Sequence, residues 1–486
     1  MKSSRVSVVA ALLSAFISSC ASDDAAPTSS ATDTFEAEDA RNDATGADSE
    51  FEGAAVDAAV DAAQDGSEPL DAPDTSGPPV PTCDATRPIV VMAHGFLASG
   101  DTWAPHTLRF LANGWCPEAL VAFDWNTVAQ DVPGAANELD ATIDAALAKV
   151  ATLSPDAPTK VVLVGHSAGG GLGVAYLSDA TRAAKVSKYV HVGSTLLKAP
   201  PEGVPTLNLW SEGDAVIGEK GNIEGATNVM LETEDHFGVA TSTRSFEALY
   251  AFVAGGVPTF TEPVPTDTVT ISGRAVAFGD NKPSKNSRLR VWEVDPTTAT
   301  RVREAPDYDA LTDDLGHFGP LTITPGAHYE LLIEGPGVPV HYYREPFLQN
   351  NPLVYLRTLP PPDAGLAGAL LSSVPFVEGA STLVAFIASR GLRHPDDTLT
   401  LDGVSLLSEA IAAPAKTLIA LFLYDGDSDP STQGAQITLF EGFPFLGALD
   451  STNPSEGHAT FKLNDRSLAV RRWPGDPDGA VIAIFD

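Results

Sequence analysis

The segment 161–170 constrains the fold of this chain more than any other. Its sequence, VVLVGHSAGG, is a short apolar run that ends in Gly-x-Ser-x-Gly and continues into a helix-like stretch. A buried parallel strand typically reads as a continuous run of Val and Leu. The glycines allow a sharp turn from this strand into the next helix and leave room for a strained serine. The pattern therefore predicts that the hydroxyl of Ser167 stands clear of a sheet, where a nucleophile must be.

Strand-like and helix-like segments alternate between residues 87 and 255. This alternation predicts an α/β fold with a mostly parallel sheet and right-handed crossovers. The helix at 103–114 is expected to turn Trp103, Leu108 and Leu111 inward, from their spacing. The expected strands are 88–93, 120–124, 161–164, 188–192, 205–210 and 227–231, and the other expected helices are 135–153 and 172–183.

Three polar residues follow strands of this predicted sheet. Ser167 follows the third strand, Asp214 the fifth and His236 the sixth. Because active sites of such sheets lie at the carboxyl ends of the strands, we expect the three side chains to meet. A serine needs a base, which His236 supplies near neutral pH, and Asp214 would fix the tautomer of that imidazole. Two backbone N–H groups, of Phe96 and Ala168, are expected to form an oxyanion hole.

Other residues near these positions have simpler interpretations. His94 and His166 lie beside the expected oxyanion loop and the serine turn, and we interpret both as structural. Asp235 is an alternative to Asp214, but a residue adjacent to His236 is badly placed to orient its ring. The residues between 193 and 204 leave little room for a lid, so the site is expected to be open or covered by the rest of the chain.

Residues 88–253 resemble an α/β-hydrolase of the bacterial lipase and esterase type. The resemblance implies catalysis by Ser167, Asp214 and His236 and needs no cofactor. Lipases of this type often have Met where this chain has Ala168, a difference that leaves the backbone donor in place. The motifs that carry the resemblance are Ala93-His94-Gly95-Phe96, Gly165-His166-Ser167-Ala168-Gly169, Gly213-Asp214 and Asp235-His236-Phe237.

After residue 258 the pattern changes to short alternating strands between turn residues, which predicts an all-β region. Residues 265–362 resemble a transthyretin-like or carboxypeptidase-regulatory-like β-sandwich, and 370–486 are expected to form a second β-rich domain. The whole order resembles lipases that carry a C-terminal β-barrel or β-sandwich. Aromatic residues at 341–343 and 440–445 form either a lipid-facing patch or part of the core. Residues 425–429 alternate acidic oxygens as calcium loops do, but the downstream glutamate of such a loop is missing at the required spacing. We therefore interpret them as a charged hairpin turn, and calcium is unsupported.

The N-terminus resembles an export signal. Lys2 and Arg5 precede an apolar stretch at 6–17 that is too short to span a membrane. It ends in Ile17-Ser18-Ser19-Cys20, which resembles a bacterial lipobox whose Cys20 becomes acylated. The alternative is an ordinary secretory signal. We expect residues 1–20 to be a lipoprotein signal peptide, and the protein to be exported to the bacterial cell envelope or surface on a lipid anchor, or secreted.

Residues 21–82 are rich in Asp, Glu, Ala, Ser and Thr and are expected to be a disordered acidic linker. The catalytic domain is expected at 83–257. Only Cys83 and Cys116 remain as thiols there, just before two strands that should be neighbours, and an exported compartment permits them to form a disulfide. The formal net charge of −35 argues against a nucleic-acid partner.

The sequence therefore predicts an exported serine hydrolase of carboxylic esters, with an ester or lipid as substrate. A polyester depolymerase or an amidase would use the same residues, since the fold does not select the substrate. A surface-binding lipoprotein with an inactive hydrolase scaffold is the non-enzymatic alternative. The acyl chain length and the oligomeric state stay open.

Overall fold

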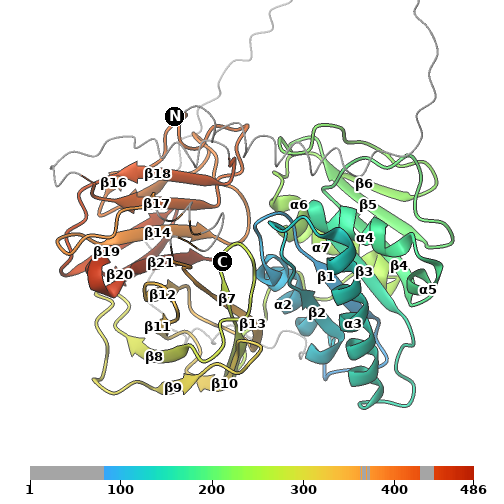
Figure 1. Cartoon of the computed structure of the whole chain (residues 1–486), viewed down its shortest axis with the longest axis horizontal. Helices are drawn as coiled ribbons and strands as arrows, with labels where there is room; N and C mark the ends of the chain where they lie inside the picture. The colour runs from blue at the N-terminus through green and yellow to red at the C-terminus, as the bar shows by residue number, and fades with distance from the viewer. Residues whose placement is uncertain (1–80, 362, 364–367, 369–370, 372, 427–442) are drawn as a thin grey trace, which may run out of the picture. The chain divides into compact units, whose positions relative to one another are not determined.

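A six-stranded parallel sheet forms the centre of the first half of the chain (Figure 1). The computed structural model describes residues 81–361, 363, 368, 371, 373–426 and 443–486, all within one unit of the chain. The predicted signal peptide with Cys20 and the linker as far as residue 80 lie outside them. The strand order is β2-β1-β3-β4-β5-β6, with β1 (Ile89–Ala93), β2 (Leu120–Phe123), β3 (Val161–His166), β4 (Val186–Val192), β5 (Thr206–Ser211) and β6 (Thr227–Leu231).

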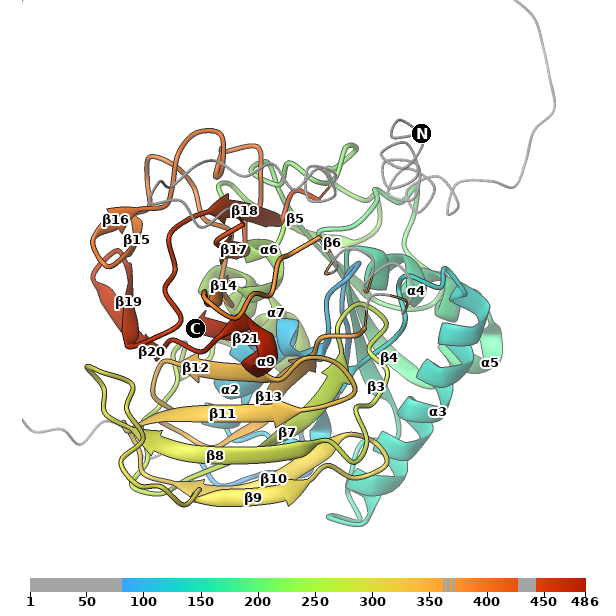
Figure 2. The same ribbon diagram turned by 60° about the vertical axis from the view of Figure 1, so that its left-hand side comes forward.

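Helices cover both faces of this sheet, which explains why every residue of β1 and β3 is buried. The helices α3 and α4 contact each other on one face, and α2 and α7 meet on the other through Phe110 and Phe246, whose ring centroids are 5.1 Å apart (Figure 2). The helical segments are η1 (Gly100–Trp103), α2 (Ala104–Ala112), η2 (Pro117–Ala119), α3 (Val132–Ala151), α4 (Ala168–Leu177), α5 (Ala180–Ala183), α6 (Gly238–Thr241) and α7 (Thr243–Ala254).

Two helix predictions need correction. Trp103 is fully buried as predicted, but the buried side chains of α2 include His106 and Phe110, whereas Leu108 and Leu111 are only half-buried. The helix expected at 172–183 begins instead at Ala168, directly after the serine, and a break divides it into α4 and α5.

The described strands of the C-terminal half form three sheets. The eight-stranded sheet has the order β18-β17-β14-β21-β12-β11-β8-β9, and the smaller sheets are β10-β7-β13 and β16-β15-β19-β20. The bounds are β7 (Val269–Ala277), β8 (Arg288–Val294), β9 (Tyr308–Leu311), β10 (His317–Ile323), β11 (His328–Glu334), β12 (Val340–Arg344), β13 (Asn351–Thr358), β14 (Thr382–Ile387), β15 (Leu399–Leu401), β16 (Val404–Ser405), β17 (Ala420–Tyr424), β18 (Leu446–Asp450), β19 (His458–Leu463), β20 (Arg466–Arg471) and β21 (Ala480–Phe485), with a short helix α9 (Gly475–Asp478).

The eight-stranded sheet joins the two β domains that the sequence predicts. Strand β21, from the second, pairs in parallel with β12 of the first and with β14. Its side chains alternate between two cores, as the period of a strand requires. Ile482 and Ile484 face the core shared with β7 and β13, whereas Val481, Ala483 and Phe485 face the four-stranded sheet. The two predicted domains, 265–362 and 370–486, therefore each contribute strands to one continuous sheet.

Two further sequence patterns are partly described. Tyr342, Tyr343 and Phe443 are buried, so these aromatic residues belong to the interior. Residues 427–442, which include most of the acidic 425–429 segment, lie outside the described residues. Among the residues that the structure describes, no helix combines the length and apolar character needed to cross a membrane.

Candidate active site

Ser167 occupies a strained turn between β3 and α4. Its φ of 54° and ψ of −120° lie outside the ordinary regions for an L-residue. The surrounding chain leaves no space for side chains at the two flanking glycines. A Cβ on Gly165 would lie 2.3 Å from the carbonyl oxygen of Gly169, and a Cβ on Gly169 would lie 2.4 Å from that of Ala93. The two glycines of the motif therefore permit the turn that raises the hydroxyl above the sheet.

The three predicted polar residues form a continuous hydrogen-bonded chain. The Nε2 atom of His236 lies 3.0 Å from the Oγ of Ser167, and its Nδ1 lies 2.8 Å from the Oδ2 of Asp214. Because a carboxylate accepts, Nδ1 is the protonated nitrogen when the ring is neutral, and Nε2 can accept the proton of the serine. Such an arrangement can supply a nucleophile, a base and an orienting carboxylate for acyl transfer.

Asp214 is held in its ionised form. Burial by itself raises the pKa of its carboxyl, but His236 and the backbone N–H groups of Val216 and Ile217 outweigh that effect and leave the pKa below its ordinary value. The two N–H groups donate to Oδ1 at 2.9 and 3.2 Å, so Oδ2 is left for His236. The sequence alternative, Asp235, does not contact the ring. It accepts from the backbone N–H groups of Phe237 and Gly238 instead.

His166 and His94 have the supporting positions that the sequence predicts for them. His166 donates from Nε2 to the carbonyl oxygen of His236 at 2.9 Å, and its burial and the neighbouring His236 lower its pKa to about 3. His94 is fully buried, and its Nδ1 donates to the carbonyl of Gly95 at 2.8 Å. Trp125 donates from its backbone N–H to His94 Nε2. Neither ring contacts the serine hydroxyl.

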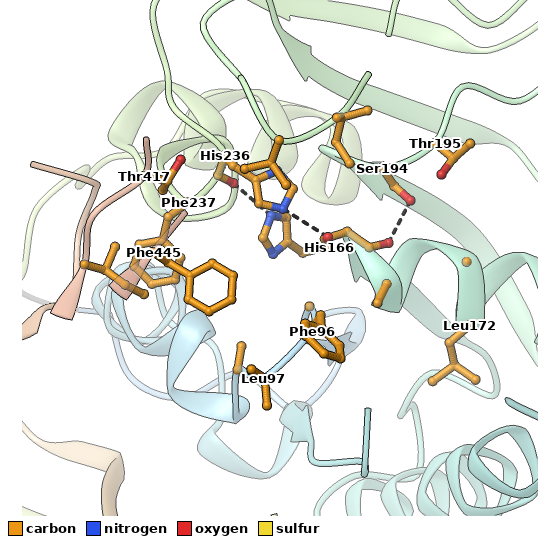
Figure 3. Close-up of a pocket in the computed structure, with 18 of the residues that line it drawn as sticks. Phe96, Leu97, His166, Leu172, Ser194, Thr195, His236, Phe237, Thr417 and Phe445 are labelled. Carbon is orange, nitrogen blue, oxygen red and sulfur yellow. Dashed lines mark hydrogen bonds between the residues drawn. The ribbon is translucent and has the colours of Figure 1, made fainter. Parts of the chain in front are cut away.

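An apolar cavity of about 140 Å³ opens next to Ser167. Figure 3 shows Phe96 and Leu97 on one side of it, with His236 and Phe237 across from them. Both predicted oxyanion residues line the cavity, and Ala168 is the first residue of α4, where backbone N–H groups have no partner within the helix. The C-terminal region contributes Thr417, Ile419 and Phe445. The C-terminal region therefore covers part of the site. The sequence predicts a site that is either open or covered in this way, because the segment 193–204 is too short for a lid.

A second apolar cavity, of about 130 Å³, adjoins the first. The two share the lining residues Leu97, Ala98, Phe237, Ile419 and Phe445. Farther from Ser167, the second cavity runs along the face of the eight-stranded sheet, where its apolar lining includes Phe386, Phe422, Ile482 and Ile484. The sequence did not predict this cavity, because its walls come from strands that are distant in the chain.

Sequence families match three parts of the chain. Residues 88–216 match the α/β-hydrolase fold, residues 267–361 match a lipase C-terminal domain, and residues 387–485 match a further C-terminal domain. The first match contains β1 to β5 with Ser167 and Asp214, and the second contains the strands that resembled a transthyretin-like module. Residues 88–216 therefore have the α/β-hydrolase fold, and the region that follows them resembles the C-terminal domain of lipases. No curated protein matches the sequence of this chain.

Solved structures resemble the hydrolase over about a third of its length. An esterase from Rhodococcus sp. shares 16% identity, covering 36% of this chain and 92% of that one, with a TM-score of 0.28. Aspergillus fumigatus lipase B shares 11% identity over 36% and 54% of the two chains, with a TM-score of 0.28. A Trichoderma reesei cutinase shares 18% identity over 36% and 78%, with a TM-score of 0.22.

Cys83 and Cys116 form a disulfide, with 4.7 Å between their Cα atoms. It lies where the chain enters β1 and β2, and Asp84 pairs with Trp115 in a parallel bridge beside it. The bond thus joins the start of the described chain to the segment that leads into β2.

Proposed function

We propose that this hydrolase cleaves carboxylic esters through an acyl-enzyme on Ser167. The observation that carries the proposal is the unbroken chain of hydrogen bonds from Asp214 through His236 to the Ser167 hydroxyl, opening on an apolar cavity. In the reaction, Oγ attacks the ester carbonyl carbon while His236 Nε2 takes its proton. The alcohol then leaves with that proton, and a water molecule, deprotonated by His236, releases the acid and regenerates the serine.

The developing negative charge needs hydrogen-bond donors. We assign this role to the backbone N–H groups of Phe96 and Ala168, which flank the cavity next to Ser167. The positive end of the α4 dipole lies at Ala168 and favours the same charge. The mechanism uses no metal or organic cofactor, so dialysis against EDTA should leave kcat unchanged.

The test is hydrolysis of p-nitrophenyl esters of increasing acyl length by the mature chain and by Ser167→Ala. Loss of turnover in Ser167→Ala, with the circular dichroism spectrum unchanged, would support the acyl-enzyme. If the folded wild-type chain cleaves no ester, the same variants are assayed on p-nitroanilides and polyester films. Turnover there would assign an amidase or a depolymerase, and its absence would favour the binding lipoprotein.

The adjoining cavities favour a long acyl chain, and hence a lipase. A straight chain bound at Ser167 could continue past Ile419 and Phe445 into the second cavity, where burial of each methylene group contributes about 0.8 kcal/mol. Ile419→Trp would narrow the passage between the cavities. We expect it to lower kcat/KM for the palmitate ester at least tenfold while changing that for the butyrate ester less than threefold. Equal losses on both esters would contradict the long-chain assignment.

We also propose that the hydrolase is exported and anchored through a lipid on Cys20, with the acidic segment 21–82 as a tether. The lipobox-like residues that end at Cys20 support this proposal. Expression in a bacterial host fed an alkyne-labelled fatty acid tests it. The wild-type chain should carry the label and sediment with membranes, whereas Cys20→Ser should do neither. An unlabelled wild-type chain in the medium would indicate an ordinary secretory signal.

A further inference from the structure

A turn of the C-terminal region enters the hydrolase domain beside the predicted oxyanion loop. Asn281 follows β7 and has a φ of 57°, in the left-handed region that Asn and Gly adopt most readily. Its side chain is buried against the segments that follow β1 and β2, more than 150 positions earlier in the chain. A buried amide needs hydrogen-bond partners for both its oxygen and its nitrogen. The partners of Asn281 therefore identify the segments that its side chain holds in place.

The amide of Asn281 binds the loop on both sides of Phe96. Its Oδ1 accepts from the hydroxyl of Ser99 at 2.5 Å, and its Nδ2 donates to the carbonyl of Ala98 at 2.8 Å. The same nitrogen lies 3.1 Å from the carbonyl of Trp125 and 3.2 Å from Nε2 of His94. Phe96 thus lies in a segment whose two ends meet one side chain of the C-terminal region.

A second contact secures the end of this loop. The carboxylate of Asp124 accepts from the backbone N–H of Gly100 at 2.8 Å. Its other oxygen accepts from the guanidinium of Arg274 at 2.7 Å and from the hydroxyl of Tyr355 at 2.6 Å, both from the C-terminal region. Asp124 belongs to the hydrolase domain, and Arg274 and Tyr355 of the C-terminal region help to orient its side chain.

The loop that carries His236 is held in the same way. The Oδ1 of Asp235 accepts from Phe237 and Gly238 and closes the turn, while its Oδ2 accepts from the backbone N–H of Gly391 at 2.9 Å. Arg393, two residues later, donates to the carbonyl of Thr233 at 2.9 Å. Asp235 is 4% exposed, so this contact is shielded from water.

We propose that Asn281 and Asp235 are positioning residues through which the C-terminal region fixes the oxyanion loop and the base. The proposal rests on the proposed ester hydrolysis. Catalytic groups need to be held within about 0.5 Å of their working geometry, and a displacement of 1 Å can cost about 10²-fold in rate. The C-terminal region therefore completes the catalytic site as well as covering it.

Asn281→Gly in the full chain tests the first contact, because glycine keeps the left-handed backbone and removes only the amide. Asn286→Gly is the matched control, since Asn286 lies in the same region with a φ of 54° and an exposed side chain. We expect Asn281→Gly to lower kcat for p-nitrophenyl butyrate 10- to 100-fold with KM within twofold. Amide hydrogen exchange in 94–100 should accelerate, while that in β3 should not. The control should match the wild type in both measurements.

Asp235→Asn tests the second contact. The asparagine oxygen can still close the turn, but its NH₂ group would face the N–H of Gly391, so only the contact with the C-terminal region is lost. Asp313→Asn is the control, because Asp313 closes a similar turn with Leu315 and His317 on the exposed surface. We expect a fall in kcat of at least tenfold and faster exchange in 233–241, with KM within twofold.

Two results would overturn the proposal. One is kcat and loop exchange at wild-type values in both variants. The other is a fall in kcat accompanied by a similar change in KM and by faster amide hydrogen exchange in β3. That result would indicate a general loss of structure. If the wild-type chain cleaves no ester, the proposed function fails, and the exchange rates alone decide whether the C-terminal region fixes the two loops.

Discussion

The imidazole of His166 donates a hydrogen bond of 2.9 Å to the backbone carbonyl of His236. Since a carbonyl only accepts, Nε2 of His166 carries a proton. Burial lowers the pKa of the ring to about 3 and so keeps the ring neutral near pH 7. The residue before Ser167 thus holds the loop that carries His236, which keeps the two ends of the Ser–His contact together.

This neutral, buried ring makes stability depend on pH. Burial, with the charge of His236, lowers the pKa of His166 to about 3, so below pH 6.5 the unfolded chain binds a proton that the folded chain does not. The stabilisation is complete above pH 6.5 and is lost as the pH falls toward 3. Between pH 7 and pH 5, the free energy of unfolding of the wild type should fall about 2 kcal/mol more than that of His166→Gln. Equal falls in urea titrations would contradict this.

Asp214→Asn should reduce kcat on a short p-nitrophenyl ester by about 10⁴, because an amide can donate to His236 and favour the wrong tautomer. The loss should appear in kcat with KM little changed, as the side chain does not contact the substrate. Asp156→Asn, at an exposed loop position, serves as the control. A reduction below tenfold would show that another group orients the base.

Gly169→Ala should destabilise the fold, since its Cβ would lie 2.4 Å from the carbonyl oxygen of Ala93 in a fully buried strand. We expect a loss of about 3 kcal/mol or more in the free energy of unfolding. Gly218→Ala meets no atom within 4 Å and should change stability by less than about 0.5 kcal/mol. Similar unfolding midpoints for both variants would show that the turn can relax.

Removal of the disulfide should lower stability by about 2–4 kcal/mol, because Cys83 and Cys116 are 33 residues apart and the bond restricts the unfolded chain. The double variant Cys83→Ser/Cys116→Ser, compared with the oxidised wild type in thermal unfolding, measures this loss. Ester turnover at 25 °C should persist, since the bond does not contact the site. Unchanged stability would mean that the disulfide does not restrict residues 83–116 of the unfolded chain any further.

The strands of the parallel sheet could be located from sequence because each is a short apolar run between turn residues. Strand β6 spans the predicted 227–231, and β1 differs from its prediction by one residue. The helix faces were harder to predict. In α2 the leucines at 108 and 111 suggested the inner face, but the core instead takes Phe110 and His106, because aromatic rings of α7 pack there.

The sequence by itself determined the turn at Ser167, the order of Ser167, Asp214 and His236, and their places after strands β3, β5 and β6. These features are local, since they depend on strand periodicity and on glycines whose missing side chains permit the turn. Only the tertiary structure decided that one sheet unites the two β domains, that Ile419 and Phe445 extend the cavity, and that Asn281 and Gly391 reach the catalytic loops. The contacts of Asn281 and Gly391 join residues more than 150 positions apart, and no local pattern encodes which distant side chain will complete a buried hydrogen bond.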